Sequence, residues 1–226
     1  MGPGEGGIVT ISVFLADDHA VVRDGLQTLL EIEDKLSVVG SASNGRDALR
    51  QVKKLAPDVV IMDISMPELN GIDATRQIIE ACPGTRVIIL SMHATREHIQ
   101  RALQAGARGY LLKESAGVEV VQAVRSVNGG NRYLSQPVAE ILIDDYLNGI
   151  QADPCSDPLE LLSTREREIL QLVVEGNSSA KIADSLCLSP KTIETYRSRI
   201  MSKINVRDMP GLVKFAIRNG LISLEI

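Results

Sequence analysis

The sequence predicts an α/β fold with a doubly wound, five-stranded parallel sheet (flavodoxin-like), followed by a small all-α domain. The first half alternates short β-branched runs with amphipathic stretches of helical period, which is typical of β-α-β repeats whose sheet is covered on both faces. The last third instead shows consecutive helix start and stop signals. At 226 residues, the chain has the length of two small domains.

The expected strands of the first half are five short apolar runs, at residues 11–16, 36–41, 58–62, 86–90 and 108–112. The stretches between them are long enough for crossover helices, which parallel strands require. Turn-forming pairs such as Asn70-Gly71 and Pro83-Gly84 lie at the expected boundaries. We therefore assign residues 9–130 to this domain and expect residues 1–8, which are rich in glycine, to be flexible.

A linker is expected at residues 131–160, after Gly129-Gly130 and with prolines 154 and 158 near its end. One linker helix is predicted inside it from the helical spacing of Val138, Ile141, Leu142 and Tyr146. Residues 161–226 then predict four helices. The first opens at a Ser163–Glu166 capping box, the second covers about 178–186, the third follows Ser189-Pro190, and the fourth covers 209–218.

Composition favours a cytoplasmic protein. The chain is 44% hydrophobic, has no apolar segment long enough to span a membrane, and its three cysteines lack the paired spacing of zinc or redox sites. The net charge of −5 is unevenly divided. Residues 1–154 carry 14 Lys and Arg against 20 Asp and Glu, whereas residues 155–226 carry 10 against 9. The acidic surplus therefore belongs to the first half, and the second half can still bind nucleic acid.

Three carboxylates end two of the predicted strands. Asp17 and Asp18 follow the run 11–16, and Asp63 follows the run that ends at Met62. If these strands are neighbours, their carboxyl ends bring the side chains to one sheet edge, where ligands of open α/β folds bind. Like charges about 4 Å apart repel by about 4 kcal/mol at an effective dielectric constant near 20. The cluster therefore needs protonation or a cation, and hard oxygen ligands suit Mg²⁺.

A hydroxyl and an ammonium group end two further strands. Ser91 follows the run 86–90, and Lys113 follows the run 108–112. Taken singly, a serine here is a turn hydroxyl, a lysine is a solvated surface residue, and Asp18 is a helix N-cap. Arriving in order at strand ends, they fit one chemistry: Asp63 attacks a phosphoryl group, a metal neutralises its oxygens, and Ser91 and Lys113 hold the rest.

Residues 11–128 resemble the receiver domain of bacterial two-component response regulators. The resemblance rests on the Asp pair, on DISMPELNGID around Asp63, on ILSMH around Ser91, and on AGARGYLLK before Lys113. It implies that Asp63 is the phosphoacceptor and that Ser91 and Tyr110 form a switch pair. The metal ligands that it implies are Asp17, Asp18, Asp63 and the backbone carbonyl of Ser65. The positions of Ser65 and His93 are those that tune hydrolysis of the aspartyl phosphate in receivers.

The second half contains a short helix, a turn and a longer capped helix, which is the pattern of a helix-turn-helix. Its sequence, LSTREREILQLVVEGNSSAKIADSLCLSPKTIETYRSRIMSKI, resembles the LuxR-type DNA-binding domain. The third helix would then enter the major groove. Base-edge contacts are implied for Glu194, Thr195 and Ser198, with Arg199 close by. Phosphate contacts are expected from Lys191, Thr192, Arg197 and Lys203.

Together, the two halves are similar to NarL/FixJ-type response regulators. The resemblance implies that a sensor histidine kinase phosphorylates Asp63 with Mg²⁺, and that dimerisation or domain release then promotes binding to promoter DNA. The implied partners are the kinase, double-stranded DNA, a second copy paired through residues 209–218, and RNA polymerase, with no membrane. No enzyme activity is expected beyond the protein's own phosphorylation and slow self-dephosphorylation.

Three other classes were weighed against this interpretation. A haloacid-dehalogenase-type phosphatase would place two aspartates one residue apart, whereas Asp17 and Asp18 are adjacent. A LuxR-type sensor of acyl ligands would need an aromatic pocket, and residues 1–154 contain four aromatics. A receiver that works without phosphorylation is disfavoured by the complete acidic set. Turnover of small phosphate esters would distinguish the phosphatase.

Overall fold

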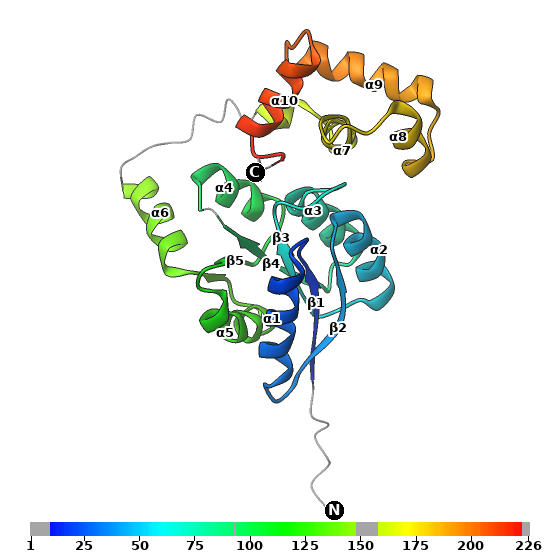
Figure 1. Ribbon diagram of the computed structural model, residues 1–226. Coiled ribbons are helices and arrows are strands. Elements are labelled where there is room, and N and C mark those ends of the chain that lie inside the picture. The colour runs from blue at the N-terminus through cyan, green and yellow to red at the C-terminus, as the bar shows by residue number, and fades with distance from the viewer. Residues whose placement is uncertain (1–9, 93, 148–157, 223–226) are drawn as a thin grey trace, which may run out of the picture.

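The computed structural model describes residues 10–92, 94–147 and 158–222. Its first half is one parallel sheet in the order β2-β1-β3-β4-β5-β6, with helices on both faces (Figure 1). The strands are β1 Ile11–Ala16, β2 Leu36–Ala42, β3 Val59–Asp63, β4 Arg86–Ser91, β5 Gly109–Leu112 and β6 Tyr133–Leu134. The predicted doubly wound parallel sheet is therefore confirmed. Because β1 and β4 flank β3, the strand ends that carry Asp17, Asp63 and Ser91 are neighbours.

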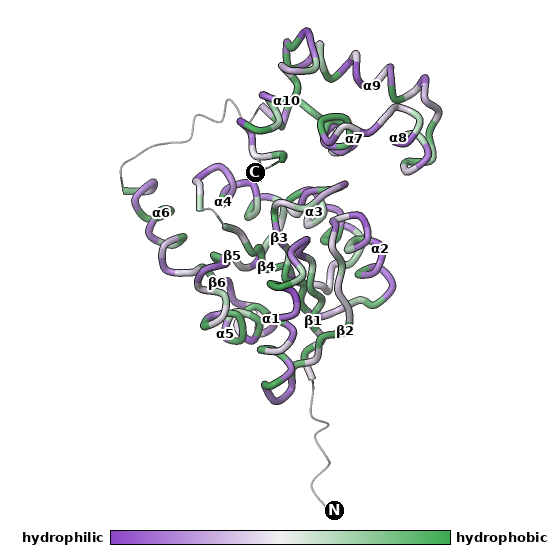
Figure 2. The backbone as a smooth tube through the Cα atoms, viewed as in Figure 1, coloured by the Kyte–Doolittle hydropathy of each residue, from purple (hydrophilic) through white to green (hydrophobic). Residues whose placement is uncertain are grey.

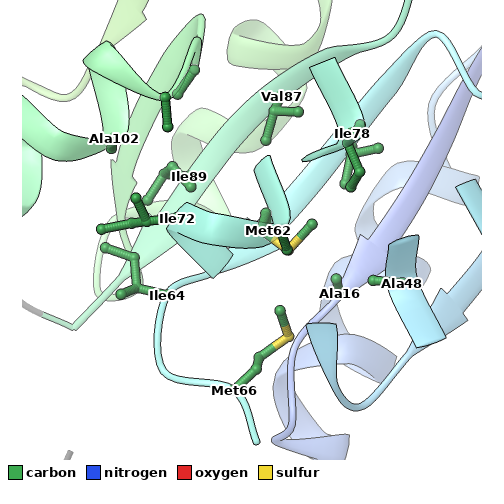
Figure 3. Close-up of a cluster of buried hydrophobic side chains, with 14 of the residues drawn as sticks. Ala16, Ala48, Met62, Ile64, Met66, Ile72, Ile78, Val87, Ile89 and Ala102 are labelled. Carbon is green, nitrogen blue, oxygen red and sulfur yellow. The ribbon is translucent and has the colours of Figure 1, made fainter. Parts of the chain in front are cut away.

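Two apolar layers hold the helices of this half onto the sheet. Helices α1 Ala20–Glu31 and α5 Ala116–Asn128 cover one face. Helices α2 Gly45–Leu55, α3 Gly71–Ala81 and α4 Arg96–Gln104 cover the other. Figure 3 shows the second layer, in which Met62 of β3 and Ile89 of β4 meet Ile72 and Ile78 of α3. Alternate residues of each strand face opposite layers, which is why these strands are apolar throughout.

The strand count is the first difference from the sequence prediction, because the sheet has six strands and not five. The sixth, β6, lies in the predicted linker and pairs in parallel with β5, with Gly109 opposite Tyr133 and Tyr110 opposite Leu134. Two residues carry no periodicity, so the sequence offered no signal for this strand. The predicted linker helix is α6, Gln136–Leu147, and it packs through Val138, Ile141 and Leu142 against the α3–α4 layer.

The second domain is helical, as predicted. Its helices are α7 Thr164–Val174, α8 Ser179–Ser185, α9 Pro190–Lys203 and α10 Met209–Arg218, preceded by a 3₁₀ turn at Pro158–Leu161. The capping box at Ser163 is present, and Ser178, Ser189 and Asp208 cap the other three helices. Figure 2 colours these helices by hydropathy, and one buried apolar cluster joins all four, through Ile169 of α7, Ile182 of α8, Ile193 of α9 and Leu212 of α10. The turn before α7, within residues that the sequence assigned to the linker, adds Leu159 to this core.

None of the helices in the described ranges has the length and apolar character needed to cross a membrane. Cys82 and Cys187 are free thiols, and Cys155 lies outside the described residues. The segment between α6 and the second domain, residues 148–157, is likewise outside them.

Candidate functional site

The structure brings the predicted acidic residues together at the carboxyl edge of the sheet. Asp17 and Asp18 follow β1, and Asp63 is the last residue of β3. Their carboxylates lie within 4.8 Å of one another and of a ring nitrogen of His19. Asp17 and Asp63 are each 2% exposed, so their charges are almost fully removed from water. The parallel alignment of β1 with β3 thus converts two distant sequence positions into one site.

Lys113 is the cation that balances this cluster. Its Nζ lies 2.9 Å from Oδ2 of Asp17 and 3.0 Å from Oδ2 of Asp63. The backbone supports this position, because the N–H of Lys113 donates to the carbonyl of Ser91 at 2.8 Å and so extends the β4–β5 ladder. A buried ammonium that loses such partners costs about 3–5 kcal/mol. Lys113 is therefore required both for the charge balance and for the fold at this edge.

His19 is a member of the cluster that the sequence interpretation missed. Its Nδ1 lies 2.8 Å from Asp18 and 3.2 Å from Asp17, and its backbone N–H donates to Asp17. It is also the N-cap residue of α1. The alternative that Asp18 caps this helix is therefore wrong. The available signal was its position, since His19 directly follows the Asp pair.

The pKa of Asp63 is raised to about 6 from its usual 3.8. Burial is the largest cause, and the negative charge of Asp17 adds to it, while Lys113 acts in the opposite direction. The pKa of Lys113 is itself raised, because attraction to Asp63 and Asp17 outweighs the effect of its burial. Three carboxylates and one ammonium leave a net negative site, which a divalent cation would complete.

The donor set fits Mg²⁺. All three acidic side chains offer hard oxygen ligands, and among the described residues Oδ2 of Asp17 and Oδ1 of Asp18 are buried without a well-aligned hydrogen bond. Oδ2 of Asp17 lies 2.9 Å from Nζ of Lys113, and Oδ1 of Asp18 lies 2.8 Å from Nδ1 of His19. Ser65 is half-buried two residues beyond Asp63, and the role of its carbonyl stays a prediction. His93 lies outside the described residues.

Ser91 and Tyr110, the predicted switch pair, are close together on β4 and β5. Ser91 is 5% exposed at the end of β4, and the Tyr110 hydroxyl is hydrogen-bonded to it. Tyr110 is fully buried, and this burial raises the pKa of its hydroxyl to about 12. Its side chain therefore already occupies the interior before any phosphoryl group is added. The backbone carbonyl of Tyr110 accepts from Ser135 at 3.0 Å, which ties β5 to the start of α6.

The second domain contacts the first half of the chain in the loop that follows Asp63. Gln171 of α7 donates from Nε2 to the carbonyl of Met66 at 2.9 Å, and its Oε1 accepts from the N–H of Asn70 at 2.8 Å. Arg167 of α7 donates to Asp73 of α3 at 2.9 Å. Met66, Asn70, Asp73, Arg167 and Gln171 are all buried. Figure 1 shows α7 and α10 lying over α3 and α4.

Two further contacts widen this junction. The guanidinium of Arg46 on α2 lies 2.9 Å from the carboxylate of Glu168. Arg101 of α4 donates to the carbonyl of Asn219, which is the C-cap residue of α10. The junction therefore holds α7 and the carboxyl end of α10 against the receiver half, and leaves α9 on the outside (Figure 1).

Helix α9 presents the predicted DNA-contacting residues on its outer side. The exposed members are Lys191, Glu194, Thr195, Ser198, Arg199 and Lys203, and the half-buried ones are Thr192 and Arg197. Ile193 and Ile200 fill the core on the opposite side. Two of the predicted phosphate-contacting residues have internal partners. Lys203 binds the buried carboxylate of Glu166 at 2.7 Å, and Arg197 lies 3.3 Å from Glu194.

The Lys203 pair stabilises the first helix of this domain. Burial would raise the pKa of Glu166, but hydrogen bonds from Lys203 and Ser163 lower it. Because Glu166 also closes the capping box, Lys203 is committed to the folding of α7. This structural role had no local signal, since the two residues are 37 positions apart.

Family models match both halves of the chain. The response regulator receiver domain matches residues 13–125, and the luxR family of bacterial regulatory proteins matches residues 160–216. The chain is 38% identical to the oxygen regulatory protein NreC of Staphylococcus carnosus (strain TM300) over 215 residues, covering 94% of this chain and 99% of NreC. The chain belongs to the NarL/FixJ-type response regulators.

Further relatives of this response regulator agree with the assignment. It is 40% identical to the response regulator UvrY of Escherichia coli (strain K12), covering 95% of this chain and 97% of UvrY. Solved structures of the Salmonella typhimurium response regulator RcsB match at 27% identity with a TM-score of 0.57, covering 92% of this chain and 98% of that one. A complex of RcsB with DNA matches at 26% identity and a TM-score of 0.56, covering 91% and 97%.

The raised pKa of Asp63 predicts that its ionisation destabilises the metal-free response regulator. The free energy of unfolding should fall by up to about 3 kcal/mol as the pH rises from the unfolded-state value of 3.8 through about 6. Asp63→Asn should remove this fall, because the amide carries no charge. Urea unfolding in chelator at pH 5 and pH 8 measures it. Asp24→Asn, an exposed site on α1, is the control, and an equal pH dependence in all three proteins would contradict the prediction.

Proposed function

We propose that this response regulator accepts a phosphoryl group on Asp63 from a sensor histidine kinase and then binds promoter DNA as a dimer. The observation that supports it most is the buried cluster of Asp17, Asp18, Asp63 and Lys113 at one sheet edge, on the same chain as an exposed helix-turn-helix surface. The kinase, the metal and the dimer are inferred from membership of the family. The geometry of the site is observed in this chain itself.

The chemistry assigned to each residue follows from the contacts. A carboxylate oxygen of Asp63 attacks phosphorus as the bond to the kinase imidazole breaks, and the electron pair leaves with that nitrogen. Lys113, 3.0 Å from Asp63, then binds a phosphoryl oxygen, and the Ser91 hydroxyl donates to another. Mg²⁺ held by Asp17, Asp18, Asp63 and the carbonyl of Ser65 would neutralise the phosphoryl oxygens. Slow hydrolysis of the aspartyl phosphate returns the protein to its resting state.

The state of Asp63 reaches the second domain through the loop that follows it. The N–H groups of Met66 and Gly71 both donate to the carbonyl of Ile64, so the loop folds tightly back beside Asp63. A Cβ at Gly71 would lie 1.9 Å from the Asp63 carbonyl, which means that α3 begins in direct contact with the phosphoacceptor. Phosphorylation of Asp63 displaces this loop and so weakens the hydrogen bonds between the loop and Gln171. The closed junction then opens.

Opening of the junction promotes dimerisation of the second domains, and it does not change how accessible α9 is to DNA. In the closed form α9 is already exposed, whereas the carboxyl end of α10 is held by Arg101 of α4. We take residues 209–218 as the pairing surface of this family. Release of α10 lets two second domains dimerise, and two copies bind half-sites more tightly than one. Regulated transcription in the cytoplasm, in contact with RNA polymerase, is the expected outcome.

Phosphorylation is tested with acetyl phosphate and Mg²⁺. The wild-type regulator should gain a covalent phosphoryl group, shift toward dimer and bind selected genomic DNA fragments at least tenfold more tightly. Asp63→Asn should keep its fold but show none of the three changes, because the amide cannot form the acyl phosphate. Intact-mass spectrometry, sedimentation and fluorescence anisotropy provide the readouts. Asp47→Asn on α2 is the matched control, and a wild-type response from Asp63→Asn would refute the proposed phosphoacceptor.

The junction is tested separately with Gln171→Ala. This change removes both loop bonds, so the unphosphorylated regulator should dimerise more readily and bind DNA several-fold more tightly than the wild type. Its radius of gyration in small-angle scattering should also increase. Gln122→Ala, an exposed glutamine on α5, controls for loss of the side chain alone. If Gln171→Ala and Gln122→Ala behave alike in both measurements, the junction does not restrain the second domain.

If α9 reads the DNA sequence, substitutions on it should fall into two groups, those that change base preference and those that weaken binding to all sequences. Thr195→Ala and Ser198→Ala should change base preference, at about 1–3 kcal/mol for each lost base contact. Lys191→Ala should weaken all sequences alike and lower the salt dependence by about one ion, because it contacts phosphate. Binding-site selection followed by anisotropy at several salt concentrations distinguishes these outcomes. A uniform loss for all three variants would mean that α9 does not read bases through Thr195 and Ser198.

A further inference from the structure

Three arginines gather at the amino edge of the sheet, at the opposite end of the strands from the acidic site. Arg86 is the first residue of β4, and Arg108 and Arg132 directly precede β5 and β6. The ladder brings them to adjacent strand ends, with Arg108 next to Arg132 and one register position away from Arg86. The N–H of Arg108 donates to the carbonyl of Val87 at 2.8 Å, and the N–H of Tyr133 donates to the carbonyl of Arg108 at 3.1 Å. Neighbouring strands lie about 4.8 Å apart, so the three arginines stand at neighbouring strand starts on one edge of the sheet.

These side chains line one hollow in which no carboxylate takes part. Its other lining residues are Ile79, Pro83, Gly84, Thr85, Gly106 and Gly130. Gly106 and Gly130 have φ values of +101° and +90°, which the turns before β5 and β6 require. A Cβ at Gly84 or Gly130 would meet nothing within 4 Å, so the backbone there is open to an incoming group. The hollow is therefore accessible, and the three arginines are its charged lining residues.

The positive charge of this hollow is not neutralised within the described residues. Arg86 reaches the amide oxygen of Asn128 at 3.5 Å, and Arg132 reaches the carbonyl of Ala107 at 3.4 Å, both neutral and long contacts. The nearby carboxylate of Asp58 is turned away and accepts from the N–H and hydroxyl of Ser12. Elsewhere in the described chain, seven arginines do lie against carboxylates: Arg46, Arg50, Arg96, Arg125, Arg165, Arg167 and Arg197.

This contrast matters because the first half of the chain is acidic overall, with 14 Lys and Arg against 20 Asp and Glu in residues 1–154. Carboxylates were abundant, yet none faces these three cations across the hollow. Guanidinium groups bind phosphate oxygens in pairs and with fixed geometry, which lysine does not achieve. A ligand that satisfies three such groups must carry several negative charges within a short chain.

We propose that Arg86, Arg108 and Arg132 form a binding site for a small polyphosphate chain, either inorganic or carried by a nucleotide. The site lies apart from Asp63, so a ligand could bind whether or not the regulator is phosphorylated. Because β6 and its Arg132 connect directly to α6, occupancy would also hold the β5–β6 pairing that leads into the linker helix.

The test is calorimetric titration of the full-length regulator with inorganic tripolyphosphate in metal-free buffer, which keeps the acidic site out of the measurement. The wild type should show one saturable site that weakens as salt rises. Arg108→Gln and Arg132→Gln should each reduce the affinity about tenfold, since each removes charge-assisted bonds. Arg50→Gln, an exposed arginine on α2, should bind as the wild type does. Arg108→Gln should fold normally, because its side chain is exposed at the start of β5.

Parallel titrations with orthophosphate and with ATP distinguish an inorganic polyphosphate from a nucleotide as the ligand. Equal affinity for ATP and tripolyphosphate supports an inorganic ligand, and tighter binding of ATP supports a nucleotide. Asp63→Asn should bind tripolyphosphate like the wild type. The test of the arginine site is therefore independent of the proposed phosphorylation of Asp63. The proposal is overturned if no saturable binding occurs, if Arg108→Gln and Arg50→Gln bind alike, or if only long DNA binds this edge.

Discussion

The ion cluster of Lys113 with Asp17 and Asp63 is the constraint on which the rest of the receiver half depends. Two carboxylates that are each 2% exposed are tolerable because an ammonium lies 2.9 Å from one and 3.0 Å from the other. That contact fixes the ends of β1, β3 and β5 relative to one another. The same burial raises the pKa of Asp63 to about 6, so the packing of this edge and the ionisation of its carboxyl have one physical origin.

The cluster lies next to the segment that meets the second domain. Asp63 is followed by a loop whose backbone groups bond to Gln171, and α3 starts against the carbonyl of Asp63 itself. A buried polar junction of this kind is stable only while each partner is satisfied, since an unpaired buried group costs about 1–3 kcal/mol. A displacement of the loop that broke its bonds to Gln171 would therefore carry a cost of this size.

Most of the site could be predicted from the sequence because its residues are local to strand ends. An apolar run followed by a polar residue marks such an end, and parallel neighbours bring the ends together, as for Asp63 and Ser91. What escaped prediction depends on distance along the chain. The Lys203–Glu166 pair, the Gln171 contacts and the two-residue strand β6 join positions with no shared pattern, so periodicity and caps are silent about them.

The sequence by itself determined the first five strands and the helices between them, the helix caps of the second domain and the three carboxylates at the acidic edge. These follow from local periodicity and from the side-chain chemistry of single positions. The tertiary structure alone decided that His19 joins the cluster, that Tyr110 is buried against Ser91, and that α7 rather than α9 meets the receiver half. Each of those outcomes depends on burial and on contacts between segments that are far apart in the sequence. Such contacts contribute to stability only once the chain has folded.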